Sequence, residues 1–222
     1  MKDYKKELNN RVPWLDVRIG KEAIDYLWDI INNSTQEINA KRTLAGNISK
    51  SRYIEDKENL FYERVLKEAS EIMYFKDSWK DYFDVVVTKK VHFPVFALDE
   101  LWMNYQKQYE FNPPHNHSGK YSFVVFMKIP THWKEQHALP WSANSNMPCA
   151  SDFQFLIGQE QGTCRDFNFP LSSTDEGRML FFPAWLTHQV FPFYGTEPEE
   201  ERITMSGNIV LYNNEREKND DD

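Results

Sequence analysis

Residues 177–188 read GRMLFFPAWLTH, a short apolar run that ends at Pro183 and leads to a histidine, His188. Short Phe- and Leu-rich runs bounded by Gly and Pro are typical of buried β-strands, and here the strand is expected at residues 179–182. Segments of the same character recur along the chain at 91–98, 101–106, 121–129, 153–157, 189–193 and 203–211. Because no helical pattern separates them, as parallel crossovers would require, we expect an antiparallel sandwich or barrel.

The first third of the chain has a different periodicity. Apolar residues recur at three- and four-residue spacing over residues 21–32 and again over 57–74, which predicts two amphipathic helices. The β-rich pattern opens at Val85–Val87. We therefore divide the chain into a helical support region (1–84), a β-core (85–212) and an acidic tail (213–222), all within one structural domain. Residues 138–149, which contain two prolines and two asparagines, are expected to form an insertion loop or a lid.

Composition limits the possible classes of protein. Of the 222 residues, 41% are hydrophobic and 15% aromatic, which is enough apolar surface for a packed core. The net charge of −8 argues against a nucleic-acid binder. Cys149 and Cys164 cannot build a disulfide framework, and no apolar run reaches the length of a membrane span or a signal peptide. These features predict a cytoplasmic protein with no membrane partner.

Three histidines stand out for their positions. His115 and His117 are two residues apart after Pro113–Pro114, and alternate residues of an extended segment face the same side. Such a pair supplies two metal ligands, although it is also compatible with an ordinary surface pair. His188 follows the buried run quoted above, and a buried imidazole needs a partner. Either a hydrogen bond in the core or a metal would provide one.

The segment 201–208, ERITMSGN, alternates polar and apolar residues. Arg202, Thr204, Ser206 and Asn208 share one face of the predicted strand. A polar face inside a barrel is costly unless it binds a ligand, and the planar fork of arginine suits a carboxylate. The alternative is a strand whose polar face looks toward solvent.

Taken together, His-x-His, the strand ending in Phe-Pro before His188, and Arg-x-Thr-x-Ser-x-Asn resemble the Fe(II)- and 2-oxoglutarate-dependent oxygenases. More narrowly, the pattern is similar to prolyl-hydroxylase-like members from bacteria and phages, over residues 98–211. The resemblance implies a mainly β double-stranded β-helix, a cupin-like jelly roll, with the N-terminal helices packed on one side.

The same resemblance implies roles for individual residues. His115, His117 and His188 would ligate iron, leaving positions open for 2-oxoglutarate and O₂. Arg202 would anchor the far carboxylate of 2-oxoglutarate, with a hydroxyl from Thr204 or Ser206. The other polar positions, Asn104, Gln106 and Asn208, would line the cosubstrate pocket. The implied reaction hydroxylates a C–H bond, on a prolyl or other peptide side chain or on a small molecule, and releases succinate and CO₂, with ascorbate as a supporting reductant.

One position departs from the family pattern. The family usually has Asp or Glu where this chain has His117, and a neutral imidazole does not reduce the charge of the site as a carboxylate does. His117 is therefore either a ligand in a three-histidine site or a neighbour of the site, with water in its place. Two other functions stay open: a catalytically inactive cupin-like metal-binding module, and a metal-free β-sandwich interaction domain. The letters His-Asn-His do not indicate a nuclease, because the residues of the nuclease motif are not consecutive.

The remaining aromatic and histidine side chains carry weaker signals. We expect His132 and His137 to be solvent-exposed or to border the substrate cleft, and His92 to be an ordinary strand residue. Trp102, Trp133 and Trp141 are expected in the core or at the rim, with Trp141 a possible substrate contact in the 138–149 loop.

Overall fold

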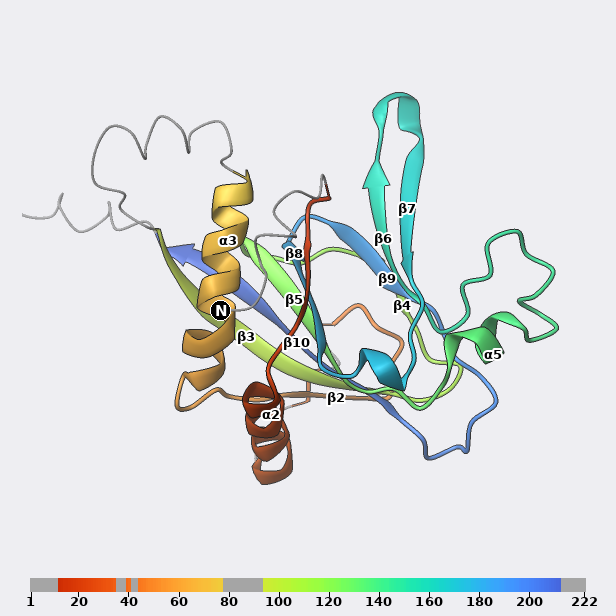
Figure 1. Cartoon of the computed structure of the whole chain (residues 1–222), viewed down its shortest axis with the longest axis horizontal. Coiled ribbons are helices and arrows are strands. Elements are labelled where there is room, and N and C mark those ends of the chain that lie inside the picture. The colour runs from red at the N-terminus through yellow and green to blue at the C-terminus, as the bar shows by residue number, and fades with distance from the viewer. Residues whose placement is uncertain (1–11, 35–38, 41–43, 78–93, 213–222) are drawn as a thin grey trace, which may run out of the picture.

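A computed structural model describes residues 12–34, 39–40, 44–77 and 94–212 (Figure 1). Its strands form two antiparallel sheets, which we call the major and minor sheets. The major sheet has the order β1-β8-β5-β10-β3-β2, with bounds β1 Leu15–Arg18, β2 Lys50–Tyr53, β3 Val95–Gln106, β5 Tyr121–Lys128, β8 Arg178–Pro183 and β10 Arg202–Tyr212. The minor sheet has the order β4-β9-β6-β7, with bounds β4 Asn112–His115, β6 Phe153–Gly158, β7 Cys164–Phe169 and β9 Thr187–Val190.

Aromatic side chains fill the space between the two sheets. Phe126 and Phe182 of the major sheet belong to the same buried cluster as Phe153, Phe155 and Phe169 of the minor sheet. Burying such side chains contributes about 1.5–3 kcal/mol each relative to exposure. The predicted jelly roll is confirmed.

The helices cover the outer face of the major sheet, on the side away from the minor sheet (Figure 1). They are α2 (Lys21–Asn33) and the helix formed by η1 (Tyr62–Leu66) and α3 (Lys67–Asp77), where η1 is a π-helical segment. Leu27 of α2 and Leu66 and Met73 of the second helix are buried with Met103 and Phe123 of the sheet. The two helices predicted from periodicity are therefore present. Three short helices lie in the connections: α5 (Trp133–His137), η2 (Glu160–Gly162) and η3 (Ser173–Asp175).

Several strand predictions change in detail. Segments 91–98 and 101–106, predicted as two strands, are parts of one strand, β3, as far as the structure describes them. β10 skips Asp99, pairing Asn208 with Glu100 and Ile209 with Leu98, so that a β-bulge accommodates Asp99 within the strand. The strand predicted at 189–193 begins earlier and ends earlier, as β9 (Thr187–Val190).

Four strands were not predicted: β1, β2, β4 and β7. β1 and β2 are edge strands of the major sheet that come from the part of the chain predicted to be helical, and β4 contains both Pro113 and Pro114. Short or polar edge strands carry little of the hydrophobic periodicity on which prediction depends. Val85–Val87, His92, the boundary at residue 84 and the tail 213–222 lie outside the described residues.

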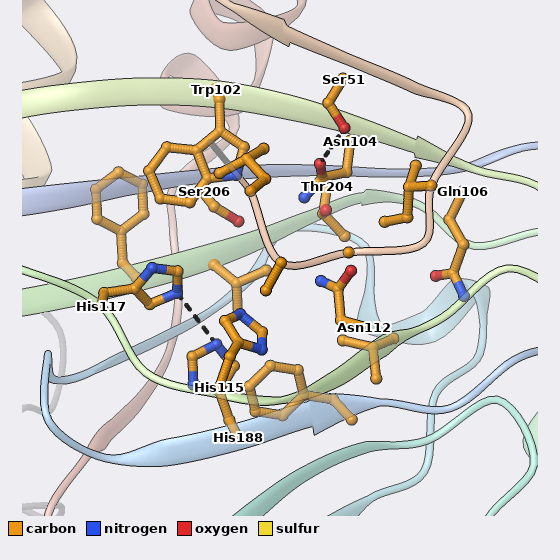
Figure 2. A pocket seen from close by; sticks show the side chains of 18 of the residues that line it. Ser51, Trp102, Asn104, Gln106, Asn112, His115, His117, His188, Thr204 and Ser206 are labelled. Atoms are coloured by element: carbon orange, nitrogen blue, oxygen red, sulfur yellow. Dashed lines mark hydrogen bonds between the residues drawn. The ribbon is translucent and has the colours of Figure 1, made fainter. Parts of the chain in front are cut away.

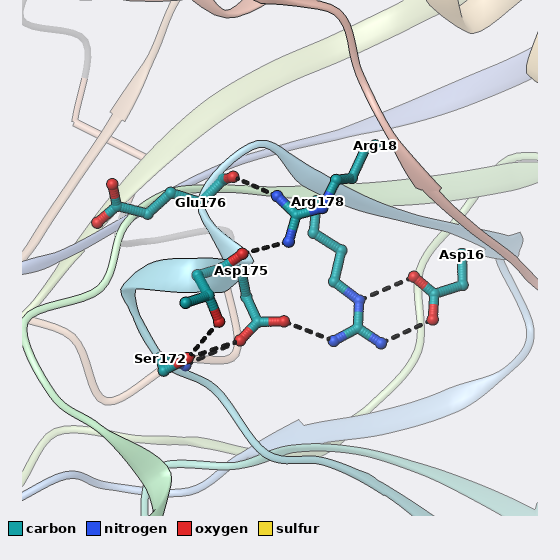
Figure 3. Close-up of polar contacts among 7 residues, drawn as sticks. Asp16, Arg18, Ser172, Asp175, Glu176 and Arg178 are labelled. Atoms are coloured by element: carbon teal, nitrogen blue, oxygen red, sulfur yellow. Dashed lines mark hydrogen bonds and ion pairs between the residues drawn. The ribbon is translucent and has the colours of Figure 1, made fainter. Parts of the chain in front are cut away.

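One ion-pair cluster joins the N-terminal strand β1 to its neighbour β8 in the major sheet (Figure 3). Arg178 of β8 donates from Nε and Nη2 to the two carboxylate oxygens of Asp16 in β1, at 2.8 and 2.7 Å. Its Nη1 pairs with Asp175 at 2.9 Å. Such a bidentate arrangement is stronger and more directional than a single ion pair. Among the described residues, no helix is long and apolar enough to cross a membrane.

Candidate active site

A cavity of about 130 Å³ opens between the two sheets (Figure 2). Its walls come from β3 and β10 on one side, from β4 and β9 on the other, and from residues 44–48, which pass across it. Arg202 is the only Asp, Glu, Lys or Arg side chain among the described residues that line it. The cavity therefore combines apolar and neutral polar walls with a single fixed positive charge.

Three histidines converge on one side of the cavity, where β4 lies next to β9. His115 is the last residue of β4 and pairs with His188 of β9 in the antiparallel register. His117 lies two residues past the strand, where its backbone N–H donates to the carbonyl of Ala184 at 2.9 Å. One ring nitrogen of each histidine lies within 4.8 Å of the others. The predicted convergence of His115, His117 and His188 is thus observed in the geometry.

Backbone carbonyls fix the orientation of two of these rings. Nδ1 of His115 lies 2.7 Å from the carbonyl of Pro113, and Nδ1 of His188 lies 3.1 Å from that of Leu186. A carbonyl only accepts, so Nδ1 must carry the proton and Nε2 keeps its lone pair. Metal-bound histidines commonly have this second hydrogen bond.

The spacing of the nitrogens suits a metal. Nε2 of His117 and Nε2 of His188 are 3.2 Å apart (Figure 2). Two nitrogens bound at right angles, with metal–nitrogen bonds of about 2.1 Å, would be about 3 Å apart. Imidazole nitrogen is a ligand that iron accepts well, so the residues present fit a divalent iron ion.

Burial keeps the three imidazoles neutral. His188 is 4% exposed and packs against the rings of Phe153 and Phe182. Desolvation lowers the pKa of His115, lowers that of His117 to about 4 with help from His115, and lowers that of His188 well below the ordinary value. Neutral imidazole is the form that binds metal. No carboxylate belongs to this cluster in the described part of the chain, so His117 has no acidic substitute there.

Arg202 lies in the wall of the same cavity and is 1% exposed. Burial lowers the pKa of Arg202 to about 10, opposed by the negative charge of Asp152, so the guanidinium remains protonated at neutral pH. Its Nη2 donates to the carbonyl and hydroxyl of Ser151, and its Nη1 lies 3.4 Å from Oε1 of Gln106. Nε has no partner among the described residues. A buried cation with an unused donor is suited to an anionic ligand.

The other predicted pocket residues divide into two groups. Asn104 and Gln106 of β3 and Thr204 and Ser206 of β10 line the cavity, as alternation predicted, because Arg202 pairs with Gln106 and Thr204 with Asn104 across the two strands. Asn208 shares their strand face but is not a cavity residue. Its amide donates to Glu100 at 2.9 Å instead.

Two peripheral histidines also differ from each other. His132 is exposed and caps α5 by accepting from the backbone N–H of Lys134. The expectation of solvent exposure is wrong for His137, whose side chain is 14% exposed and whose Nε2 lies 2.9 Å from the fully buried carboxylate of Asp152. Of the tryptophans, Trp102 is buried beside His117 in the cavity wall, whereas Trp141 is 65% exposed and packs against Tyr194.

Sequence reasoning missed three residues of the site and one irregularity in a strand beside it. Ser151 holds Arg202 from a different part of the chain. Asn112 lines the cavity, and its Oδ1 is buried without a partner in the described structure. Gly46, in the segment that crosses the cavity, lies so close to Asn112 that an added Cβ would meet this Oδ1 at 2.0 Å. A β-bulge between Asn112 and His115 could not be foreseen from two consecutive prolines.

Comparison with known proteins gives a consistent result. Residues 100–208 match the family model described as putative 2OG-Fe(II) oxygenase. A 2OG-Fe(II) oxygenase family oxidoreductase from Burkholderia pseudomallei aligns with a TM-score of 0.55 at 9% identity, over 94% of this chain and 88% of that chain. The non-heme alpha ketoglutarate dependent epimerase SnoN from nogalamycin biosynthesis aligns with a TM-score of 0.52 at 10% identity, over 90% and 79%.

A prolyl-4-hydroxylase from Pseudomonas putida aligns with a TM-score of 0.47 at 10% identity, over 91% of this chain and 95% of that chain. Comparison with curated proteins gives no match. At 9–10% identity, the two solved structures with TM-scores above 0.5 indicate a shared fold and no more. The match of residues 100–208 to the 2OG-Fe(II) oxygenase family rests on the family model.

Proposed function

We propose, for a chain that belongs to the superfamily of Fe(II)- and 2-oxoglutarate-dependent oxygenases, that His115, His117 and His188 hold the iron and that Arg202 anchors 2-oxoglutarate. The enzyme uses Fe(II), 2-oxoglutarate and O₂. When bound, the iron supplies the oxidising chemistry. One oxygen atom of O₂ goes into succinate as 2-oxoglutarate loses CO₂, and the second oxygen atom is inserted into a C–H bond of the substrate.

The observation that carries this proposal is the placement of three neutral imidazoles and one buried guanidinium in a single cavity. The Pro113 and Leu186 carbonyls hold two of the rings with Nε2 unprotonated, ready for a metal. Arg202 keeps Nε, which has no partner among the described residues, and Nη1, whose contact with Gln106 is long, and the far carboxylate of 2-oxoglutarate would accept from one of these two donors, which lie on different edges of the guanidinium. Thr204 and Ser206 line the cavity on the same strand face, and in this proposal one of them adds a hydroxyl.

For the substrate we propose an uncharged aliphatic group, in the first instance a prolyl or other peptide side chain. The support is the chemistry of the cavity wall: Leu44, Ala45 and Trp102 are apolar, and Arg202, the one charged lining side chain described, is taken by the cosubstrate. A charged substrate group would lose its hydration without gaining a partner. We also propose a cytoplasmic location, because Cys149 and Cys164 are both free.

The test is an anaerobic titration of the purified chain. We expect 2-oxoglutarate to bind with micromolar-range affinity when Fe(II) or Mn(II) is present, and far more weakly when it is absent, as followed by calorimetry. Admission of O₂ to the Fe(II) sample is expected to yield equal amounts of succinate and CO₂. Absence of metal-dependent 2-oxoglutarate binding would overturn the proposal.

Matched variants assign the roles. His188→Ala is expected to abolish metal binding, and with it metal-dependent 2-oxoglutarate binding. Arg202→Gln is expected to retain the metal but to weaken 2-oxoglutarate by about tenfold or more, because a hydrogen-bonded charge contributes about 1.5–3 kcal/mol. His132→Ala, which removes an exposed histidine outside the cavity, is the control and should leave both affinities unchanged. If Arg202→Gln bound 2-oxoglutarate normally, the anchor would have to be another residue.

A further inference from the structure

We propose that Ser151 is a positioning residue that holds the guanidinium of Arg202 in the orientation needed for 2-oxoglutarate, and so gives the site its preference for a 2-oxo acid with a second carboxylate. The inference rests on the proposed role of Arg202. Ser151 comes from the segment before β6, far in sequence from both β3 and β10.

The contacts of Ser151 converge on one nitrogen. Nη2 of Arg202 donates to the Ser151 carbonyl at 2.8 Å and also to the Ser151 hydroxyl. A guanidinium Nη carries two hydrogens, so Ser151 satisfies this nitrogen completely. The Nη1 contact with Gln106 is long, at 3.4 Å, and Nε is without a partner in the described structure. The donors left over are those that a carboxylate can accept from.

The conformation of Ser151 is what allows one residue to present both acceptors. Its φ is +73°, in the left-handed region that non-glycine residues rarely adopt, and its side chain is fully buried. Such backbone strain costs about 1–3 kcal/mol and persists only when the surroundings enforce it. Here the Ser151 N–H donates to the Pro192 carbonyl at 2.9 Å.

The hydroxyl is also oriented by its neighbours. Oγ of Ser151 lies 3.0 Å from Oγ1 of Thr131. A hydroxyl oxygen has two lone pairs, so Oγ can accept from Arg202 whichever of the two hydroxyls donates in the contact with Thr131. The ring of Phe193 lies 5.2 Å from the guanidinium carbon and limits movement on that side. The arginine is therefore held in one orientation before any ligand arrives, which lowers the ordering cost of binding.

The experiment compares two ligands in Ser151→Ala, using the whole chain with Mn(II) and calorimetry. One ligand is 2-oxoglutarate. The other is 2-oxopentanoate, which has the same carbon chain and the same metal-chelating end but lacks the far carboxylate. We expect 2-oxoglutarate to bind about tenfold more weakly in the variant, since a hydrogen bond to a charged group is lost. Binding of 2-oxopentanoate should stay within twofold of the wild type. In a separate turnover assay with Fe(II) and O₂, kcat at saturating 2-oxoglutarate should change little while the KM for 2-oxoglutarate rises.

Two further variants keep the result interpretable. Ser151→Gly removes the same hydroxyl but tolerates the positive φ, so it should show the same selective loss even if Ser151→Ala folds poorly. Ser70→Ala removes another buried serine hydroxyl, one that donates to the Leu66 carbonyl, and should change neither ligand's affinity. Equal weakening of both ligands, or no weakening in either Ser151 variant, would overturn the inference. Failure of the wild type to bind 2-oxoglutarate with metal would instead refute the proposed function itself.

Discussion

A single residue, Gly46, decides how closely the segment 44–48 can lie over the cavity. Residues 44–48 cross the opening, and the isolated bridge between Asn47 and Phe111 fixes them next to the turn before β4. Gly46 sits at the tightest point of this contact, against Asn112. Its lack of a side chain is required by the Asn112 side chain, whose Oδ1 lies where a Cβ would be, and not by its φ.

Gly46→Ala is therefore expected to impair ligand binding more than folding. The added Cβ would meet Oδ1 of Asn112 at 2.0 Å, so either the segment or the asparagine must move. Overpacking of this kind costs about 1–3 kcal/mol, and a cost of that size borne by the cavity wall corresponds to a loss of about 5- to 150-fold in metal-dependent 2-oxoglutarate affinity. Calorimetry checks the affinity. The control is Gly158→Ala, because nothing lies within 4 Å of a Cβ there. Equal affinities in the two variants would show that the segment has no part in the site.

A site residue could be predicted when its place follows from its own strand, and could not when it depends on a contact that is distant in the sequence. Arg202, Thr204 and Ser206 were predictable because strand alternation places them on one face, whatever the rest of the fold does. Ser151 was not, because nothing in the local sequence indicates a left-handed serine or its contact with an arginine 51 positions away. His137 resembled a surface histidine because its partner, Asp152, becomes a neighbour only in the folded chain.

At the scale of elements, the site depends on the register of two strand pairs. β10 pairs with β3 so that the polar residues of both face the cavity, and β4 pairs with β9 so that His115 is opposite His188. Long strands with a strong apolar pattern, continuous in β5 and alternating in β10, were predicted within a residue or so of their ends. β1, β2 and β4 were not, since their stability comes from pairing with a neighbour and not from their own periodicity.

The ion pair between Arg178 of β8 and Asp16 of β1 is expected to stabilise the attachment of β1 to the sheet. Arg178→Lys keeps the positive charge but cannot make the bidentate contact with Asp16 while also pairing with Asp175. We expect the variant to lose about 1–2 kcal/mol of unfolding free energy, since the arginine is only partly exposed and the contacts are charge-assisted. Urea denaturation measures the loss, and 2-oxoglutarate affinity should not change.

Lys21→Gln is the matched control for this variant. It removes an ion pair with Asp25 whose side chains are 84% and 59% exposed, and pairs of this kind contribute little. A stability loss in Lys21→Gln as large as that in Arg178→Lys would mean that charge in general, and not the bidentate geometry, stabilises the N-terminal strand.

At the scale of the whole molecule, the metal site bridges parts of the chain that are far apart. His115 ends β4, His117 lies two residues beyond it and His188 belongs to β9. The cavity they share is closed on its other side by β3 and β10 of the major sheet. Burial disfavours the charged form of each imidazole, as the lowered pKa of each shows, and so presents three neutral nitrogens that a metal can bind. A ligand that binds only this arrangement stabilises the folded state of the whole β-core by mass action.

Metal should therefore raise the thermal stability of the full chain. At a Mn(II) concentration about a hundredfold above its Kd, the expected gain is about 2.7 kcal/mol, which is a rise of about 5–10 °C in Tm for a protein of this size. Differential scanning calorimetry with Mn(II) and with a chelator measures it. His188→Ala should lose the rise entirely, whereas His132→Ala, outside the site, should keep it. Because the three ligands act together, an unchanged rise in His188→Ala would place the metal elsewhere on the molecule and remove the basis for the oxygenase site in this cavity.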